Sequence, residues 1–200
     1  MSKKVSIGVL VSGGGTNLQA LIDAQSSGIL TSGEIKLVIS NNKDAFALTR
    51  AENVGIKTAI VDKNGDTPFE EQIISLLEEN EIEIIVLAGF MCILSEKFVK
   101  KYDKKIINVH PSLIPSFCGK GFYGLRVHKA ALDYGVKVTG ATVHFVNEIP
   151  DGGEIIMQKS VEIEENDTPE ILQKRVMEQA EWKILPLSVE KVCKSIGKGE

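Results

Sequence analysis

Three polar residues have the types and positions needed to stabilise an oxyanion and move a proton. Asn108 and His110 lie two residues apart at the end of an apolar run, and Asp151 lies in a Pro-Asp-Gly-Gly turn. Strand periodicity points the first two side chains to one face. An amide and an imidazole together could hold an oxyanion and relay a proton. A carboxylate beside the imidazole would orient the ring and favour its charged form.

Each of these residues also has a structural interpretation. Asn108 could brace a turn, His110 could cap a strand end, and Asp-Gly is a strong turn signal. His144 lies mid-strand and is interpreted as structural, and His128, near a helix start, as solvated or loop-anchoring. The sequence alone does not place Asp151 next to His110, so both interpretations stay open here.

The glycine-rich segment 12–17 joins a predicted strand to a predicted helix and suits a phosphate. Such a loop lets the backbone approach a ligand, and a helix N-terminus favours an anion. A dinucleotide fingerprint would need glycine or alanine at Leu18 and an acidic residue where Ser40–Asn42 follow the second strand. A P-loop would need Gly-Lys-Ser/Thr, which is absent. We predict a loop for one phosphate monoester, with Thr16 and Asn17 as further donors, or else a tight turn.

The cysteines argue against a metal centre. Cys92, Cys118 and Cys193 are far apart and show no metal-ligand spacing, so zinc is not expected and a reducing compartment is. A hydrolase elbow of the Gly-x-Ser-x-Gly type is also absent. A cysteine nucleophile stays open only through Cys92 or Cys118.

Composition limits the classes of partner. The chain has 200 residues, 43% hydrophobic and 25% charged, with a net charge of −4, which argues against a bulk nucleic-acid binder. It contains neither a signal-peptide pattern nor an apolar run long enough to span a membrane. We therefore expect a cytoplasmic protein with small-molecule partners, no nucleic acid and no membrane.

Strand and helix patterns alternate through the first half of the chain. Strands are predicted at 5–11, 35–40, 57–61, 84–87 and 106–109, with helices at 17–26, 44–53, 68–80 and 95–102 between them. This alternation predicts an α/β fold with a Rossmann-like, doubly wound and mostly parallel sheet. Ligands of such sheets bind outside the carboxyl ends of the strands.

The pattern changes after residue 109. A Pro/Gly-containing segment at 111–124 precedes a short helix at 127–134, a pair of antiparallel strands at 136–147 and 154–163, and a final helix from about 168 to 193. Asp44 and Ser95 are predicted helix caps, and Pro68 suits a first helical turn. A single domain over 1–200 is the simplest organisation.

Four sequence blocks together resemble one known family. They are residues 12–20 (SGGGTNLQA), 88–91 (AGFM), 108–115 (NVHPSLIP) and 150–153 (PDGG). The whole chain is similar to the phosphoribosylglycinamide formyltransferases, a folate-dependent formyltransferase family of purine biosynthesis. The resemblance implies transfer of the formyl group of 10-formyltetrahydrofolate to the amine of 5-phosphoribosylglycinamide, by direct attack and without a metal.

The resemblance also implies roles for particular residues. The catalytic trio would be Asn108, His110 and Asp151. The acceptor would be held by Gly15, Thr16 and Asn17 at its phosphate and by Glu181 at its ribose. The pterin ring would lie against two segments, with backbone contacts from Phe90, Met91, Cys92, Ile93, Leu94, Val146 and Asn147. Residues 1–105 would then form the phosphate-binding half and 106–200 the folate-binding and catalytic half.

The chain departs from the family in three places. Many members have arginine where this chain has Cys92, so a side-chain contact to folate would be lost here. Segment 64–68 also lacks an arginine that is common in the family. Loop 117–127, with its glycines and two cations, is longer than in some members and is either a lid or an ordinary surface loop.

Three other functions were weighed against formyl transfer to the glycinamide. A 10-formyltetrahydrofolate hydrolase usually adds an N-terminal domain and reads His-His-Ser where this chain has His110-Pro111-Ser112. A methionyl-tRNA formyltransferase usually adds a C-terminal domain and more basic charge. The third is a non-catalytic module that binds a phosphate ligand. The chain is expected to be a monomer or a homodimer.

Overall fold

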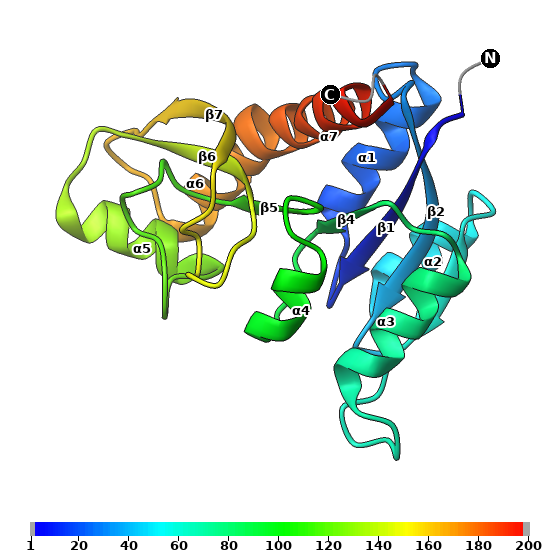
Figure 1. The fold of residues 1–200 in the computed structure, drawn as a ribbon. Helices are drawn as coiled ribbons and strands as arrows, with labels where there is room; N and C mark the ends of the chain where they lie inside the picture. Colours follow the sequence, from blue (N-terminus) through cyan, green and yellow to red (C-terminus); the bar gives the residue numbers. More distant parts are fainter. Residues whose placement is uncertain (1–2, 198–200) are drawn as a thin grey trace.

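The computed structural model describes residues 3–197, which form one seven-stranded sheet flanked by helices (Figure 1). The strands are β1 (Val5–Val11), β2 (Gly33–Ser40), β3 (Lys57–Ile60), β4 (Ile84–Leu87), β5 (Ile106–His110), β6 (Val138–Phe145) and β7 (Ile155–Glu162). The helices are α1 (Thr16–Ser26), α2 (Phe46–Glu52), α3 (Phe69–Glu79), α4 (Glu96–Lys101), α5 (Leu125–Tyr134), α6 (Pro169–Val176), the π-helical η1 (Met177–Glu181) and α7 (Trp182–Gly197).

The sheet order is β3-β2-β1-β4-β5-β6-β7. The first five strands pair in parallel, β6 is antiparallel to β5, and β7 is antiparallel to β6. This confirms the mostly parallel, doubly wound sheet with antiparallel C-terminal strands. Because the chain reverses its direction of winding between β1 and β4, a crevice is expected outside their carboxyl ends.

Both faces of the sheet are covered, so its central strands are buried throughout. All seven residues of β1 are buried, as a parallel sheet with helices on both faces requires. Ile7 and Val9 belong to the apolar cluster that includes α1 and α7, whereas Leu10 belongs to the cluster with α3 and α4. Period-two alternation therefore divides one strand between two cores.

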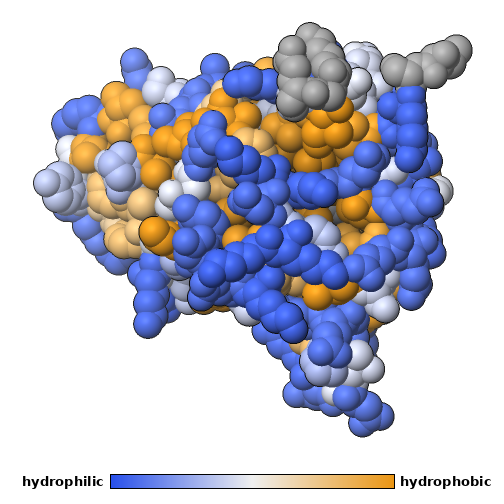
Figure 2. Space-filling model, in the orientation of Figure 1, coloured by the Kyte–Doolittle hydropathy of each residue, from blue (hydrophilic) through white to orange (hydrophobic). Residues whose placement is uncertain are grey.

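The surface is largely hydrophilic on the face shown in Figure 2, where apolar areas show between the polar side chains, among them one over α7. Among residues 3–197 there is no helix with the length and apolar character that crossing a membrane requires.

Of the two predicted N-caps, Asp44 and Ser95, the structure confirms only Ser95. Helix α2 begins at Phe46 rather than 44, with Ala45 at its N-cap and no side-chain cap, so Asp44 does not cap it. The reason is a local turn in which Asn42 Oδ1 accepts from the Asp44 amide. Ser95 caps α4 as predicted, because its hydroxyl accepts from the Phe98 amide.

The predicted C-terminal helix is helical without a break over residues 169–197 but contains a π-helical turn. It divides into α6, the π-helical turn η1 and α7, with Glu181 as the last residue of η1. Pro186 lies inside α7 and has no N–H to donate to the carbonyl four residues earlier. π-Helical turns occur often at functional sites, and this one delivers Glu181 beside the start of α1.

Candidate active site

The loop between β1 and α1 presents a set of free backbone N–H groups. The amide of Ala47 donates to the Gly13 carbonyl at 3.0 Å, and Arg50 Nε donates to the Gly14 carbonyl at 2.8 Å. In a trans peptide a carbonyl and the N–H group of the next residue point in opposite directions. The N–H groups that follow these two carbonyls therefore point away from α2. Within the described chain, the N–H groups of residues 13–17 donate to no protein acceptor. This is the geometry of an anion site at a helix N-terminus.

Gly15 is required at the turn into α1. Its φ of 71° lies in the left-handed region, and a Cβ there would lie 2.6 Å from the Cβ of Ala47. The loop therefore packs against α2 as closely as a glycine allows, which keeps its carbonyls within reach of their α2 donors.

Asn17 and Glu181 meet beneath this loop, although they are distant in the sequence. Asn17 Nδ2 donates to Glu181 Oε2 at 2.8 Å, and Asn17 Oδ1 is buried without a hydrogen-bond partner among residues 3–197. Glu181 is only 6% exposed. Burial raises the pKa of its carboxyl, and the hydrogen bond from Asn17 opposes that rise only in part.

The three predicted catalytic residues also converge. Asn108 and His110 lie on β5, and the turn after β6 brings Asp151 Oδ2 to 3.5 Å from His110 Nδ1. The Asp151 side chain is 14% exposed, so it does not face bulk solvent. The antiparallel register places His144 opposite Asn108, and their side chains approach to 3.2 Å between Nδ2 and Nε2.

This cluster lies at the same edge of the sheet as the glycine loop. Leu10 pairs with Leu87, and Leu87 pairs with Asn108, so the three form one row across β1, β4 and β5. Adjacent strands lie about 4.8 Å apart, so Asn108 is roughly 10 Å from Leu10, two residues before the loop. Both groups of residues therefore lie at the carboxyl edge of the sheet, around its reversal point.

The turn that carries Asp151 has a demanding backbone. Asp151 has a φ of 57°, and a Cβ on Gly153 would lie 1.7 Å from the Phe145 carbonyl oxygen. Gly153 is therefore obligatory if the turn is to fold back against β6. Asp151 Oδ2 also accepts from the Gly119 amide at 2.8 Å, which ties the turn to loop 117–127.

His144 is a site residue that the sequence reasoning missed. Its Nδ1 lies 2.8 Å from the Phe145 carbonyl oxygen and donates to it, because a carbonyl oxygen only accepts. Nε2 then accepts from Asn108 Nδ2, which orients that amide and leaves its second N–H available. His144 Nε2 also lies 3.7 Å from Asp151 Oδ1. Only the strand register, which the sequence does not state, would have indicated this.

The charge balance of His110 differs from the sequence expectation. Burial lowers its pKa and outweighs the opposing effects of Asp151 and of the Phe117 carbonyl, while His144 adds a small further lowering. The neutral ring is therefore favoured, with its proton on Nε2, which faces the Phe117 carbonyl at 2.9 Å. The Asp151 carboxylate acts in the expected direction, because it raises the pKa of His110, but burial has the larger effect.

Asp151 itself is ionised at neutral pH. Burial alone would raise its pKa, but His144, His110 and the Gly119 amide together lower it below its usual value. The site thus pairs a neutral imidazole that carries a donor N–H with a carboxylate that can accept a proton.

The candidate folate segments lie beside each other at the same edge. Phe90, Leu94 and Val146 are partly buried and pack against one apolar cluster. Met91 and Ile93, by contrast, are 59% and 87% exposed. The other two candidates are half-buried: Cys92 carries a free thiol, and Asn147 donates to the Gly152 carbonyl.

Loop 117–127 contacts the cluster directly. Besides the backbone contacts of Phe117 and Gly119, the Phe117 ring packs edge-on against Phe122 and Tyr134. The loop therefore contacts the predicted catalytic residues directly, and both interpretations of it, lid and ordinary surface loop, stay open.

His128 is not solvated, which corrects the sequence interpretation. It is fully buried on α5, and neither ring nitrogen has a hydrogen-bond partner within residues 3–197. Burial, and to a lesser degree a charge on His110, lower its pKa to about 4. It is therefore neutral near pH 7.

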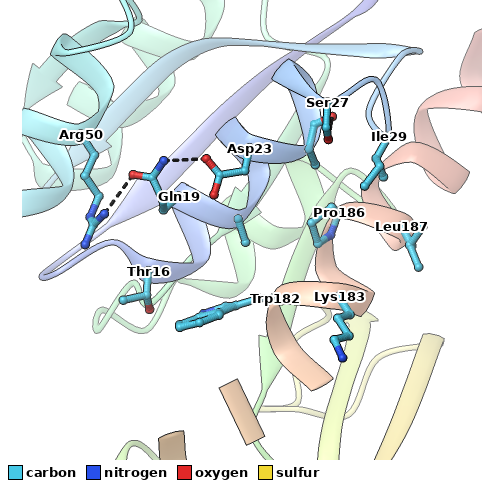
Figure 3. A pocket seen from close by; sticks show the side chains of 12 residues that line it. Thr16, Gln19, Asp23, Ser27, Ile29, Arg50, Trp182, Lys183, Pro186 and Leu187 are labelled. Carbon is cyan, nitrogen blue, oxygen red and sulfur yellow. Dashed lines mark hydrogen bonds between the residues drawn. The ribbon is translucent and has the colours of Figure 1, made fainter. Parts of the chain in front are cut away.

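A cavity of about 590 Å³ lies between α1, α2 and α7 (Figure 3). It shares only Thr16 with the predicted site residues and does not reach Asn108, His110 or Asp151. Along one side, Gln19 accepts from Arg50 and donates to Asp23. The predicted catalytic residues therefore lie outside this cavity. No group of three or more potential metal ligands occurs within the described ranges of the chain.

Comparison with known proteins agrees with this fold. Residues 5–189 match the formyl transferase family. Phosphoribosylglycinamide formyltransferase of Haemophilus influenzae is 41% identical over 186 residues, covering 92% of this chain and 84% of that protein. The crystal structure of the Anaplasma phagocytophilum enzyme of that name has a TM-score of 0.87 and 41% identity, covering 96% and 88% of the two chains.

A longer relative matches over only part of its length. The trifunctional purine biosynthetic protein adenosine-3 of Gallus gallus is 45% identical over 195 residues, and the chain spans 19% of that protein. A chain with a doubly wound sheet, a glycine anion loop and this edge cluster has the architecture of a formyl transferase. It belongs to the formyl transferase family, among the phosphoribosylglycinamide formyltransferases.

Proposed function

We propose that this protein transfers the formyl group of 10-formyltetrahydrofolate to the amine of 5-phosphoribosylglycinamide, a step of de novo purine biosynthesis. The observation that carries the proposal is the convergence of Asn108, His110 and Asp151 at the sheet edge that also holds the anion loop. Family membership supports the choice of substrates.

The acceptor would bind at the start of α1. Its phosphate would accept hydrogen bonds from the backbone N–H groups of Gly15, Thr16 and Asn17, where the helix dipole also favours an anion. Glu181 would accept from ribose hydroxyls. Hydrogen bonds donated by the ligand would lower the pKa of Glu181 and so oppose the effect of burial, which raises it.

The folate would occupy the edge formed by segments 90–94 and 146–151. Apolar Phe90, Leu94 and Val146 would contact the pterin ring, and backbone groups would supply its polar contacts. In this arrangement residues 1–105 mainly serve the acceptor and residues 106–200 the formyl transfer.

The reaction would proceed by direct attack of the acceptor amine on the formyl carbon. A new C–N bond forms, the bond from that carbon to the folate N10 breaks, and one proton moves from the attacking to the leaving nitrogen. In the transition state, negative charge on the formyl oxygen would be stabilised by the free N–H of Asn108 and the Nε2–H of His110. His144 is the positioning residue that aims the Asn108 amide.

His110 must exchange one acceptor for another in this scheme. Its Nε2–H now donates to the Phe117 carbonyl, so loop 117–127 would shift when the formyl oxygen takes that place. The developing oxyanion offsets the burial that lowers the pKa of His110, so the ring gains proton affinity during the reaction. Asp151, which is ionised, would accept the amine proton and pass it on.

The experiment is steady-state turnover of Asn108→Ala with both substrates saturating. Loss of one oxyanion donor should lower kcat by about 100- to 1,000-fold. Asn53→Ala, at the exposed end of α2, is the matched control and should keep wild-type kcat. Near-normal turnover of Asn108→Ala would refute the assigned role.

Omitting the acceptor separates this function from its rivals. A transferase releases no formate without 5-phosphoribosylglycinamide, a hydrolase releases it at full rate, and a binding module shows no turnover in either case. The three free thiols are in keeping with a cytoplasmic, reducing compartment.

A further inference from the structure

Ser12 joins the two proposed substrate sites through its hydroxyl group. It is the first residue after β1 and begins the glycine loop. Its Oγ donates to Asn41 Oδ1 at 2.6 Å and accepts from the Met91 amide at 2.8 Å. Met91 belongs to the candidate folate segment, whereas the loop that Ser12 begins belongs to the acceptor site.

The direction of these hydrogen bonds is determined by their partners. Met91 contributes a backbone N–H, which only donates, so Ser12 Oγ accepts there and its own proton goes to Asn41. Asn41 follows β2, the neighbour of β1 on one side, and Met91 follows β4, the neighbour on the other. One hydroxyl therefore connects the carboxyl ends of three adjacent strands.

The segment around Met91 depends on this contact because core burial does not hold it. Met91 is 59% exposed and Ile93 is 87% exposed, so few packed neighbours constrain their backbone. The glycine loop, in turn, takes its position from α2 through Gly13 and Gly14. A displacement of either segment is thus transmitted to the other through Ser12.

We propose that Ser12 is a positioning residue that couples acceptor binding to folate binding. This inference rests on the proposed function, because it needs both substrates at this edge. A ligand bound at the glycine loop fixes the position of Ser12. The hydrogen bond from the Met91 amide to Ser12 Oγ then orders the folate segment before the second substrate binds. The coupling is reciprocal, since it is a free energy shared by two binding equilibria.

The test uses Ser12→Ala in the full-length protein. The KM of each substrate should rise by about three- to tenfold, the range that one net hydrogen bond supplies, while kcat changes by less than about threefold. Calorimetry should also give the Kd of 5-phosphoribosylglycinamide with and without saturating tetrahydrofolate, the reaction product. We expect tetrahydrofolate to tighten acceptor binding at least about fivefold in the wild type and not in Ser12→Ala.

Two further pairs of variants separate coupling from loss of structure. Ser12→Thr keeps the hydroxyl and should restore both the KM values and the coupling. Asn41→Asp keeps an acceptor for the Ser12 proton and should stay close to the wild type, whereas Asn41→Ala should resemble Ser12→Ala. If Ser12→Ala fails to fold, the Asn41 pair tests the same contact from its other side.

The outcomes distinguish the two proposals. A wild-type protein that forms no formylated product refutes the proposed function. A wild-type protein that turns over, with Ser12→Ala showing unchanged KM values and unchanged coupling, refutes the role of Ser12 alone. Equal loss in Ser12→Ala and Ser12→Thr would also refute it, because the hydroxyl would then be irrelevant.

Discussion

The C-terminal helices place one buried glutamate near the start of α1 and another near the segment between α1 and β2. Glu181, the last residue of η1, meets the start of α1, and Glu190, in α7, meets the residues just before β2. Both are 6% exposed. Their pKa values nevertheless move in opposite directions: that of Glu181 is raised, and that of Glu190 is lowered to about 2.

The depth at which each carboxyl group is buried and the number of its donors together explain the difference. Burial alone would raise both pKa values. Glu190, however, accepts hydrogen bonds from the backbone amide and hydroxyl of Thr31 and of Ser32, at 2.8–3.1 Å, and pairs with Lys194. Glu181 accepts only from Asn17 among the described residues.

The comparison separates a carboxylate that the protein itself satisfies from one that the proposed acceptor would satisfy. At Glu190 the protein satisfies the charge and connects α7 to the strand edge. At Glu181 it leaves acceptor capacity unused beside the free N–H groups of the glycine loop. Buried polar groups are normally hydrogen-bonded, so the shortfall at Glu181 indicates donors that a ligand supplies.

The largest effect is expected from Glu190→Ala. Removing the carboxylate removes the acceptor of four hydrogen bonds from Thr31 and Ser32, so the free energy of unfolding should fall by about 3 kcal/mol. Urea denaturation measures this, and acceptor affinity of the folded fraction should stay at the wild-type value. Lost acceptor binding at unchanged stability would contradict the structural role.

Gly15→Ala tests the packing of the glycine loop against α2, near Glu181. A non-glycine residue at this φ costs about 1–2 kcal/mol, and the contact with Ala47 adds to it, so unfolding should become about 2 kcal/mol easier. Gly28→Ala is the matched control, because Gly28 also has a positive φ but no atom within 4 Å of an added Cβ. Equal losses in the two variants would show that the close approach of the loop to α2 is unimportant.

Glu181→Gln should separate binding from stability. The amide keeps the shape of the side chain and removes a buried charge, so unfolding free energy should stay the same or rise. Acceptor Kd should increase about tenfold, because charge-assisted hydrogen bonds to the ligand are lost. Glu190→Gln serves as the reciprocal control, with lower stability and unchanged Kd; the reverse pattern would overturn the comparison.

The pH dependence of stability should differ in sign between the two glutamates. The folded-state pKa of Glu190 is depressed, so its contribution is present above the usual 4.5 and is lost as pH falls toward about 2. That of Glu181 is raised, so its contribution is present below 4.5 and is lost as pH rises through the folded-state pKa. Unfolding curves of the wild type and each Gln variant between pH 2 and 8 measure both differences. Parallel curves would refute the assignment.

Much of the site could be predicted from short segments of sequence. The glycines and Thr-Asn of 12–17, the Asn-x-His pair and the Asp-Gly-Gly turn each depend on local backbone geometry, which neighbouring residues decide. Alternating apolar runs likewise indicate a parallel sheet, and a parallel sheet places strand ends at one edge. The sequence by itself therefore determined which chemical groups reach the active edge.

The tertiary structure decided how those groups act on one another. The partnership of His144 with Asn108 depends on the register of β5 and β6, and the link from Ser12 to Met91 joins residues 79 positions apart. The opposite pKa values of Glu181 and Glu190, and the neutral ring of His110, depend on how many donors and how much burial surround each group. These quantities are sums over neighbours in space, and neighbours distant along the chain become known only when the chain is folded.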